Sequence, residues 1–326
     1  MVKLLKEFRA SHKEMRQAYC DALIEAAKKD ERIAMVNCDL CSSMGLKPFA
    51  AEFPERSVNV GIEEANGCSM AGGMSVAGMI PFFNTFAVFA TRRVYDQIFM
   101  SCAYPKLNVK IIGGDAGVSA TNNGGTHMPF EDMGIMRVMP GVTVLEPSDP
   151  VMMTSLTKTL AETYGVQYMR FTRKKTLQIY EEGSEFEIGK AVTLREGKDA
   201  VVFACGLMVA EALEAADMLA KEGIEAAVID MFTIKPVDRE CIIRYAKETG
   251  AVVTAENHQV IGGLGSAVAE VLAENCQVPL ERVGVKDEFG EVGPQDYLME
   301  RFKLTAPNIA EAVKKVIKKK KKQDWR

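Results

Sequence analysis

The sequence predicts an α/β protein with two doubly wound domains whose sheets are mainly parallel. Its 326 residues suit two domains of about 150 residues each. Short apolar runs alternate with segments of helical period along nearly the whole chain. A charged, glycine-containing stretch at 176–198 interrupts this alternation, so we expect a first domain at 1–175, a linker with one or two entry strands, and a second domain at 199–326. Strands that alternate with helices form parallel sheets, so helices should cover both faces.

The first domain is expected to open with a helix, because apolar residues recur at helical spacing within 15–29. Short apolar runs bounded by charged or turn residues mark the buried strands. The expected strands are 33–36, 58–60, 82–86, 109–112, 142–145 and 166–171, and the further helices are 63–79, 88–102, 131–138 and 149–163. Residues 65–91 carry no formal charge and are long enough to cross a membrane. Their glycines, together with Pro81 and Asn84, favour a small-residue helix followed by a buried strand, so no membrane association is expected.

The second domain repeats the alternation of strands and helices. The expected strands are 200–204, 226–231 and 251–255, and the expected helices are 209–222, 238–249, 266–274 and 307–318. The last helix has Pro307 in its first turn and continues into a run of lysines at 318–322. We interpret this run as a solvated tail that suits the helix dipole.

The composition excludes several classes of function. Apolar residues make up 48% and charged residues 26% of the chain, as in ordinary globular proteins. The net charge of −4 and the pI of about 5.7 offer no basic field, so no nucleic-acid partner is expected. Eight scattered cysteines without a secretory signal before them indicate reduced thiols and a cytoplasmic location. Cys38 and Cys41 form one CxxC pair, but a zinc site would need a second pair or nearby histidines, and the chain has only three histidines, so no metal site is expected on it.

A glycine-rich turn at 262–266 follows a strand and opens a helix, which is the setting of a dinucleotide fingerprint. However, Val268 stands where the third small residue should be, and Pro279 and Leu280 lie where an acidic residue is needed. A nicotinamide-dependent oxidoreductase is therefore the weakest hypothesis, and a tight turn between strand and helix explains the glycines.

Three motifs in the first domain carry chemistry. The first is Asn59-Val60-Gly61-Ile62-Glu63-Glu64, which places carboxylates after a strand and at the start of an apolar helix. Burial favours the protonated form of a carboxylate, and a proton-sharing Glu that faces a ring nitrogen is an acid/base device. Alternatively, the two glutamates only favour the helix N-terminus.

The second motif supplies two aromatic rings, and the third supplies a loop histidine. Phe86 and Phe89 are three residues apart and could wall a planar heterocycle, or could simply pack in the core. His127 lies in Gly124-Gly125-Thr126-His127-Met128-Pro129, a glycine-rich loop beyond the strand at 109–112. Open parallel sheets bind ligands at that edge, which favours a functional His127.

In combination, the order GIxE, TFxxF and GxTHxP resembles the pyrimidine-binding domain of transketolase. The segments 231–238, 256–265 and 282–287 resemble the C-terminal domain of the same family, so the resemblance covers about residues 12–317. The N-terminal part of transketolase, which carries the diphosphate and Mg²⁺ motif, has no counterpart here. Gly113-Gly114-Asp115-Ala116 followed by Asn122-Asn123 lacks the residue and the spacing of that motif. The chain therefore resembles the C-terminal subunit of a split transketolase.

This resemblance implies a thiamine diphosphate cofactor shared between two chains. It implies that Glu64 hydrogen-bonds the pyrimidine ring and activates the cofactor, and that Phe86 and Phe89 bind that ring. It implies that His127 acts in catalysis through the oxygens of the donor sugar. The implied reaction transfers a two-carbon ketol unit from a ketose phosphate, or a related modified ketose, to an aldose acceptor.

The resemblance also implies substrate contacts, with two departures from the family pattern. Arg170, Arg16 and Ser43 match positions that bind the distal phosphate, although Arg16 could equally be an exposed helix residue. Asn123 stands where the family has an Asp that reads a hydroxyl. Asp115 lies near the place of a phosphate-gripping His, and an acid there would repel a phosphate. We therefore expect a modified sugar or an anion that is held differently.

The resemblance implies a partner as well as a substrate. The expected partner is an N-terminal transketolase subunit that carries the diphosphate site and the ligands of Mg²⁺ or Ca²⁺, and the expected assembly is a two-fold heterotetramer. The alternatives are the beta subunit of a 2-oxo-acid dehydrogenase, a part of a deoxyxylulose-phosphate-synthase-like enzyme, and a non-catalytic assembly subunit. The sequence leaves the donor and acceptor sugars open.

Overall fold

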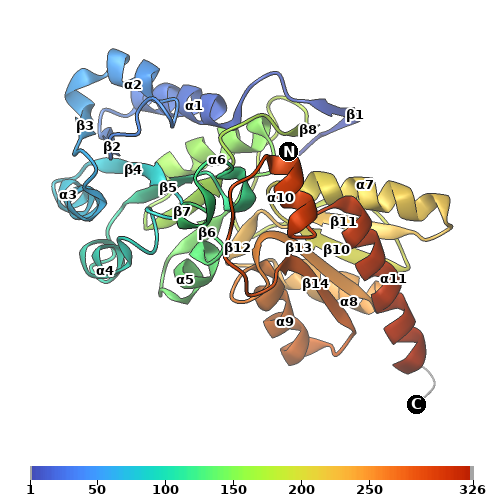
Figure 1. The fold of residues 1–326 in the computed structure, drawn as a ribbon. Coiled ribbons are helices and arrows are strands. Elements are labelled where there is room, and N and C mark those ends of the chain that lie inside the picture. Colours follow the sequence, from blue (N-terminus) through green and yellow to red (C-terminus); the bar gives the residue numbers. More distant parts are fainter. Residues whose placement is uncertain (1, 324–326) are drawn as a thin grey trace.

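In a computed structural model, which describes residues 2–323, the chain folds around two mainly parallel sheets that lie side by side (Figure 1). The first sheet has seven strands in the order β12-β6-β7-β5-β4-β2-β3, and the second has five in the order β14-β13-β10-β11-β9. Only β12 and β9 run antiparallel to their neighbours within these two sheets. The predicted α/β class with mainly parallel sheets is thus confirmed.

The first sheet carries the N-terminal unit. Its strands are β2 (Ile33–Asn37), β3 (Ser57–Asn59), β4 (Ile80–Phe86), β5 (Lys110–Gly114), β6 (Thr143–Leu145), β7 (Gln167–Phe171) and, from the distant part of the chain, β12 (Thr233–Lys235). Its helices are α1 (Met15–Lys29), α2 (Lys47–Glu52), α3 (Glu64–Val76), α4 (Tyr95–Ile98), α5 (Asp132–Val138) and α6 (Pro150–Glu162). Helices α1, α2 and α6 cover one face of the sheet, while α3, α4 and α5 cover the other (Figure 1).

The second sheet follows a connecting stretch. A two-stranded ribbon of β1 (Leu4–Ala10) and β8 (Leu177–Tyr180) ties the N-terminus to this stretch. The strands of the second sheet are β9 (Val192–Arg195), β10 (Ala200–Ala204), β11 (Ala226–Asp230), β13 (Val252–Gln259) and β14 (Leu280–Val285). Its helices are α7 (Met208–Lys221), α8 (Arg239–Thr249), α9 (Leu264–Asn275), α10 (Gln295–Arg301) and α11 (Ala306–Gln323).

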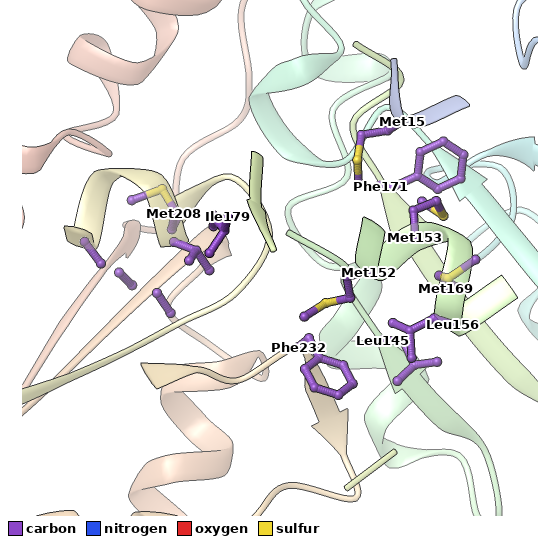
Figure 2. Close-up of a cluster of buried hydrophobic side chains, with 14 of the residues drawn as sticks. Met15, Leu145, Met152, Met153, Leu156, Met169, Phe171, Ile179, Met208 and Phe232 are labelled. Carbon is purple, nitrogen blue, oxygen red and sulfur yellow. The ribbon is translucent and has the colours of Figure 1, made fainter. Parts of the chain in front are cut away.

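The hydrophobic core continues from one unit into the other. In the central strands, neighbouring side chains such as Phe82 and Phe83 point to opposite faces and join two different clusters. One cluster combines the α1 and α6 side of the first sheet with the α7 and α11 side of the second. Figure 2 shows part of it, where Met152 and Phe232 lie between the two units. The two sheets therefore share apolar packing and do not form separate cores.

The elements differ from the predictions in three places. The predicted helix at 88–102 begins later, because 87–93 form turns before α4 and the π-helical segment Phe99–Ala103. β12 leaves its own unit and pairs with β6 of the first sheet. The sequence analysis did not identify β1, β12, β14, α2 and α10. The uncharged run at 65–91 folds as expected into α3 and β4, and no helix within the described residues has the length and apolarity to cross a membrane.

Candidate active site at the carboxyl edge of the first sheet

The predicted site residues gather where the parallel strands of the first sheet end. Glu64 follows β3, Phe86 ends β4, and Asp115 follows β5. Ser43 lies in the turns after β2, and His127 lies in the long connection between β5 and α5. Since the carboxyl ends of parallel strands meet at one edge, the fold brings together residues that are far apart in the sequence.

Glu64 is the first residue of α3, and only 2% of its surface is exposed. One carboxylate oxygen accepts a hydrogen bond from Thr85 Oγ1 at 3.2 Å. The other lies 2.7 Å from Nη1 of Arg93, whose guanidinium stacks on the Phe89 ring at 3.7 Å from its centroid. The carboxylate is thus buried, as the motif predicted, and Arg93 joins it to the face of Phe89.

Phe86, Phe89 and His127 form one aromatic group. The His127 ring meets Phe89 edge-on at 5.0 Å between centroids and lies 6.4 Å from Phe86. Thr126 Oγ1 lies 2.8 Å from Nδ1 of His127. Burial, followed by the charges of Arg93 and Arg92, lowers the pKa of His127 below its ordinary value of 6.5. His127 is therefore neutral at pH 7 and can donate or accept a hydrogen bond.

A charged cluster flanks the aromatic group. Arg173 binds both carboxylate oxygens of Asp115 at 2.7 Å and stacks over Phe86 at 4.9 Å. The main-chain oxygen of Ser43 accepts hydrogen bonds from Arg173 at 2.7 Å and from Arg16 at 3.0 Å. Arg16, Ser43 and Asp115, three of the expected substrate-binding residues, therefore lie together.

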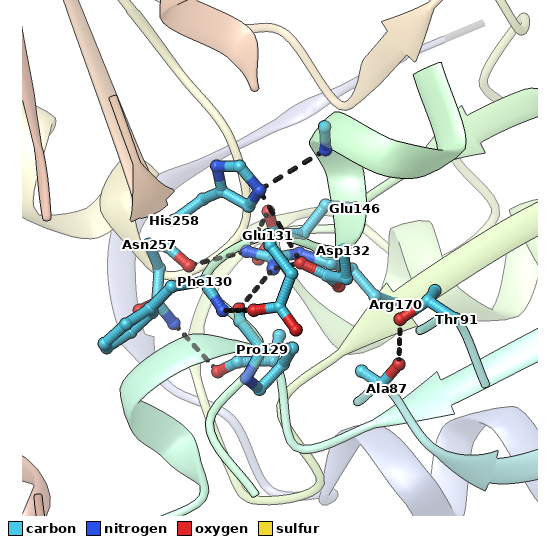
Figure 3. A network of polar contacts seen from close by, with 12 residues as sticks. Ala87, Thr91, Pro129, Phe130, Glu131, Asp132, Glu146, Arg170, Asn257 and His258 are labelled. Atoms are coloured by element: carbon cyan, nitrogen blue, oxygen red, sulfur yellow. Dashed lines mark hydrogen bonds and ion pairs between the residues drawn. The ribbon is translucent and has the colours of Figure 1, made fainter. Parts of the chain in front are cut away.

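Arg170 does not belong to this cluster, which corrects its expected role as a phosphate ligand. Its side chain is fully buried and lies 2.6 Å from Asp132 and 3.1 Å from Glu146. It also donates to the carbonyl of Asn257 in the second sheet at 2.7 Å, as Figure 3 shows. Residue 170 lies inside β7 between two other strands, so its guanidinium points into the junction of the two units and is closed to substrate.

The junction also fixes the loops of the site. The Asn257 side chain accepts a hydrogen bond from the Val118 N–H at 3.0 Å and donates to the Ala116 carbonyl at 2.9 Å. A Cβ at Gly117, whose φ is +50°, would lie 2.1 Å from Asn257 Oδ1, so this close approach requires glycine. The loop that carries Asp115 is therefore held by the second unit.

The glycine-rich turn at 262–266 binds a side chain of the protein itself. The buried Glu256 carboxylate accepts hydrogen bonds from the N–H groups of Leu264 and Gly265 at 2.7 and 2.8 Å. This acid uses the first two N–H groups of α9, which are donors that a dinucleotide pyrophosphate would need. The structure thus supports the rejection of a nicotinamide site.

The remaining candidate, Asn123, contributes its backbone. It is exposed, and its carbonyl oxygen accepts a hydrogen bond from Thr126 Oγ1 at 3.3 Å. Among the described residues, the Asn123 side chain forms no hydrogen bond with the other predicted site residues, and only its main chain takes part in the loop. The described residues also contain no group of three His, Cys, Asp or Glu side chains that could hold a metal ion.

The sequence analysis missed Thr85, Arg93 and Arg173. Thr85 is part of the TFxxF motif, so its hydroxyl beside Glu64 was open to prediction. Arg173 follows the end of β7 by two residues, and this position beyond the strand was the available signal. Arg93 lies in a turn that was predicted to be helix, and no local pattern indicates its return to Glu64.

The contacts of Arg93 test whether a planar heterocycle fits this site. A guanidinium is flat and carries N–H donors. It makes here the two contacts that an aminopyrimidine would need, an N–H···O bond to Glu64 and a stacked face on Phe89. The Arg93 side chain is 41% exposed and can move aside. The side chains of Glu64 and Phe89 therefore fit a flat ring that bears N–H groups.

Comparisons with known proteins agree with this geometry. Residues 11–178 match the family model of the transketolase pyrimidine-binding domain, and residues 189–309 match that of the transketolase C-terminal domain. These matches confirm the resemblance seen in the motifs.

Individual relatives cover nearly the whole chain. A 6-deoxy-6-sulfo-D-fructose transketolase subunit of Clostridium sp. (strain MSTE9) is 49% identical over 94% of this chain and 95% of its own length. A solved structure described as a split gene transketolase in an inactive beta4 tetramer is 44% identical, covers 94% of this chain and 98% of that chain, and has a TM-score of 0.86. A 1-deoxy-D-xylulose-5-phosphate synthase of Heliobacterium modesticaldum is more distant, at 34% identity over 92% of this chain and 46% of the synthase.

Proposed function

The chain belongs to the transketolase family as a C-terminal subunit of the split kind, and we propose that it binds thiamine diphosphate together with an N-terminal partner and transfers a two-carbon ketol unit from a ketose to an aldose. The observation that carries this proposal is the buried Glu64 carboxylate, which Arg93 joins to the aromatic group of Phe86, Phe89 and His127. A buried acid linked to a group of aromatic side chains is typical of a catalytic site and is not expected of a subunit with a purely structural role.

Glu64 would hold a proton at the nitrogen of the pyrimidine ring, and Phe89 and Phe86 would contact the face of that ring. Bound thiamine diphosphate supplies a carbon nucleophile and an electron sink for the two-carbon unit. Thr85 orients the Glu64 carboxylate through its hydroxyl. Arg93 would give up its contacts with Glu64 and Phe89 to a bound ring, so the carboxylate would keep an N–H donor in both states.

His127 would contact the oxygens of the donor sugar. It lies against Phe89 and is neutral at pH 7 because its pKa is lowered, so it can both donate and accept hydrogen bonds as the sugar carbonyl changes. The Arg173 and Arg16 cluster lies beyond Phe86 and would receive an anionic group at the far end of the sugar. The donor in this proposal is a ketose phosphate or a modified ketose, such as the sulfonated sugar for which one relative is named.

The partner would dock where α3 begins. The solvent-facing side of α3 presents Met70 and Val76, and no residue between 65 and 77 is charged. The neighbouring π-helical segment exposes Met100 and, just after it, Tyr104, which is 75% exposed. An uncharged face of this kind favours a protein interface, and Glu64 lies at its edge. A cofactor ring at Glu64 would then lie between two chains.

The remaining parts of the proposal follow from this shared site. Mg²⁺ or Ca²⁺ and its ligands would belong to the N-terminal subunit, which also binds the diphosphate. Two copies of each chain would form a two-fold heterotetramer. A cytoplasmic location stays a prediction from the cysteines, all eight of which are free in the structure.

A reconstituted pair of subunits tests the proposal. The purified chain and its N-terminal partner would be mixed with thiamine diphosphate, Mg²⁺, xylulose 5-phosphate and ribose 5-phosphate, and each subunit would also be assayed alone. Glu64→Gln should lower the rate by about a thousandfold or more, because an activating proton contact is lost. Glu63→Gln is the matched control, since Glu63 precedes it in the same motif but is exposed. A seven-carbon ketose formed by the wild-type and Glu63→Gln pairs alone would support the proposal.

The same preparation separates the competing functions. Pyruvate with glyceraldehyde 3-phosphate would give deoxyxylulose 5-phosphate if the pair were a synthase. Pyruvate with an artificial electron acceptor would give a reduced acceptor if the chain were a dehydrogenase subunit. Cofactor binding without turnover of any donor would indicate an assembly role and contradict ketol transfer.

A further inference from the structure

The cluster beyond the aromatic group contains two positive and two negative side chains. Arg173 is paired with Asp115 through two bonds of 2.7 Å, and Arg16 is paired with Glu14 at 2.7 Å. The carbonyl of Ser43 joins the two guanidiniums. The four charged groups therefore sum to zero formal charge, although they present two arginines to a ligand.

Asp115 cannot easily leave this cluster. It is 6% exposed, its φ of +62° fixes it in a tight left-handed turn, and Arg173 binds both of its oxygens. The neighbouring residue Ala116 is held by Asn257 from the second unit. A ligand at Arg173 would therefore meet the charge of Asp115 as well.

Arg173 keeps donors for a ligand in spite of its two partners. A guanidinium has five N–H groups, and the contacts of Arg173 with Asp115 and Ser43 use three of them. The remaining two suit a pair of oxygens on one tetrahedral group. A sulfonate carries one negative charge at pH 7, whereas a phosphate monoester carries about 1.5 to 2. The extra charge of a phosphate would face Asp115, and both arginines of this cluster are already paired with carboxylates.

We propose that this end of the site selects a singly charged anion of the sulfonate class over a doubly charged phosphate, and that Asp115 is the residue that makes the choice. The inference rests on the proposed ketol transfer and concerns the end of the donor that does not react. Arg173 binds the anion, and Asp115 sets the charge that the site tolerates.

Three ketoses that differ only at C6 test this inference. The subunit pair would be supplied with fructose bearing a sulfonate, a phosphate or a hydroxyl at C6, and kcat/KM would be measured for each. Hydroxypyruvate, which delivers the same two-carbon unit and has no distal end, reports ketol transfer itself. We expect the sulfonate to exceed the phosphate by about tenfold or more, since one close like charge is worth about that factor in a partly buried site.

Asp115→Asn removes the charge and keeps the shape, because Asn tolerates a left-handed backbone. The variant should lose most of the preference through a lower KM for the phosphate, so that the ratio of kcat/KM for the sulfonate over the phosphate falls toward one, while its turnover of hydroxypyruvate serves only to show that the variant is folded and transfers the ketol unit. Asp287→Asn is the matched control, since Asp287 also has a positive φ (+53°) but is exposed and lies outside the cluster.

The outcomes are distinguishable. Equal or better use of the phosphate by the wild-type pair, or an unchanged ratio in Asp115→Asn, would overturn the inference while turnover of hydroxypyruvate upheld ketol transfer. Failure of every donor, hydroxypyruvate included, would count against ketol transfer and would remove the inference with it.

Discussion

Replacing Arg170 by methionine should destabilise the protein strongly without acting selectively on substrate binding. Arg170 is fully buried and is the cation between the buried carboxylates of Asp132 and Glu146. Its removal would leave two buried negative charges without that partner. Breaking one buried ion pair in this way costs about 3–5 kcal/mol. For domains of this size, each kcal/mol shifts Tm by roughly 2–4 °C, so the expected loss in Tm is about 6–20 °C.

Arg173→Met provides the comparison. The ion pair of Arg173 with Asp115 is partly exposed, so its loss should cost only about 1 kcal/mol of stability. The same change should raise the KM for an anionic ketose, because Arg173 supplies the free N–H donors of the site. Thermal unfolding followed by circular dichroism and steady-state kinetics of the subunit pair would be measured for both variants.

Arg170 and Arg173 are three residues apart and should respond in opposite ways. An Arg170→Met protein that unfolds at the wild-type temperature and loses only its affinity for the anionic ketose, as expected of a phosphate ligand, would refute these roles. If Arg170→Met does not fold, Arg170→Lys keeps the charge and should give an intermediate loss of Tm with an unchanged KM.

Three other changes have expected results. Arg93→Met should tighten the binding of thiamine diphosphate to the subunit pair about fivefold in fluorescence titrations, because about 1 kcal/mol is no longer spent on displacing the arginine; weaker binding would show that Arg93 assists the cofactor instead. Arg92→Met should raise the pKa of His127 as followed by NMR, since a nearby positive charge is removed; an unchanged titration would contradict this. Burial raises the pKa of Asp230 from 3.8 to about 7, so the folded state binds more protons than the unfolded state between those values, and the free energy of unfolding should fall as pH rises from about 4 to 7. Asp230→Asn should flatten this dependence in urea denaturation, and an equally steep curve in the variant would assign the effect to other groups.

The alternation of strands and helices was predictable because its physical signal is local. Apolar runs and helical periods gave β10, α7 and β11 nearly to the residue. Strand β12 was not predictable in the same way, since it joins a sheet whose other strands lie far away in the chain. No local pattern records such a pairing.

In the candidate site, too, residues with a local sequence signal were predictable and residues placed by long-range contacts were not. Glu64, Phe86, Phe89 and His127 belong to short motifs, and the structure brings these four side chains together. The choice between Arg170 and Arg173 depended on where strand β7 ends, because Arg170 lies inside the strand at the buried junction and Arg173, three residues later, lies at the open edge of the sheet.

The junction explains why the two units of this chain stay on one polypeptide in a split enzyme. Asn257 holds the loop after β5, and His258 Nε2 accepts a hydrogen bond from the Gly134 N–H of α5 at 3.3 Å (Figure 3). The ion pairs of Arg170 lie against the same strand of the second sheet. If the two units were separate chains, these charged groups would be hydrated before the chains met. Each association would then have to remove the charges from water, which costs free energy. The proposed interface through α3 would instead be formed by an uncharged helix and would require no such pairing, so it is the physically easier place for a boundary between subunits.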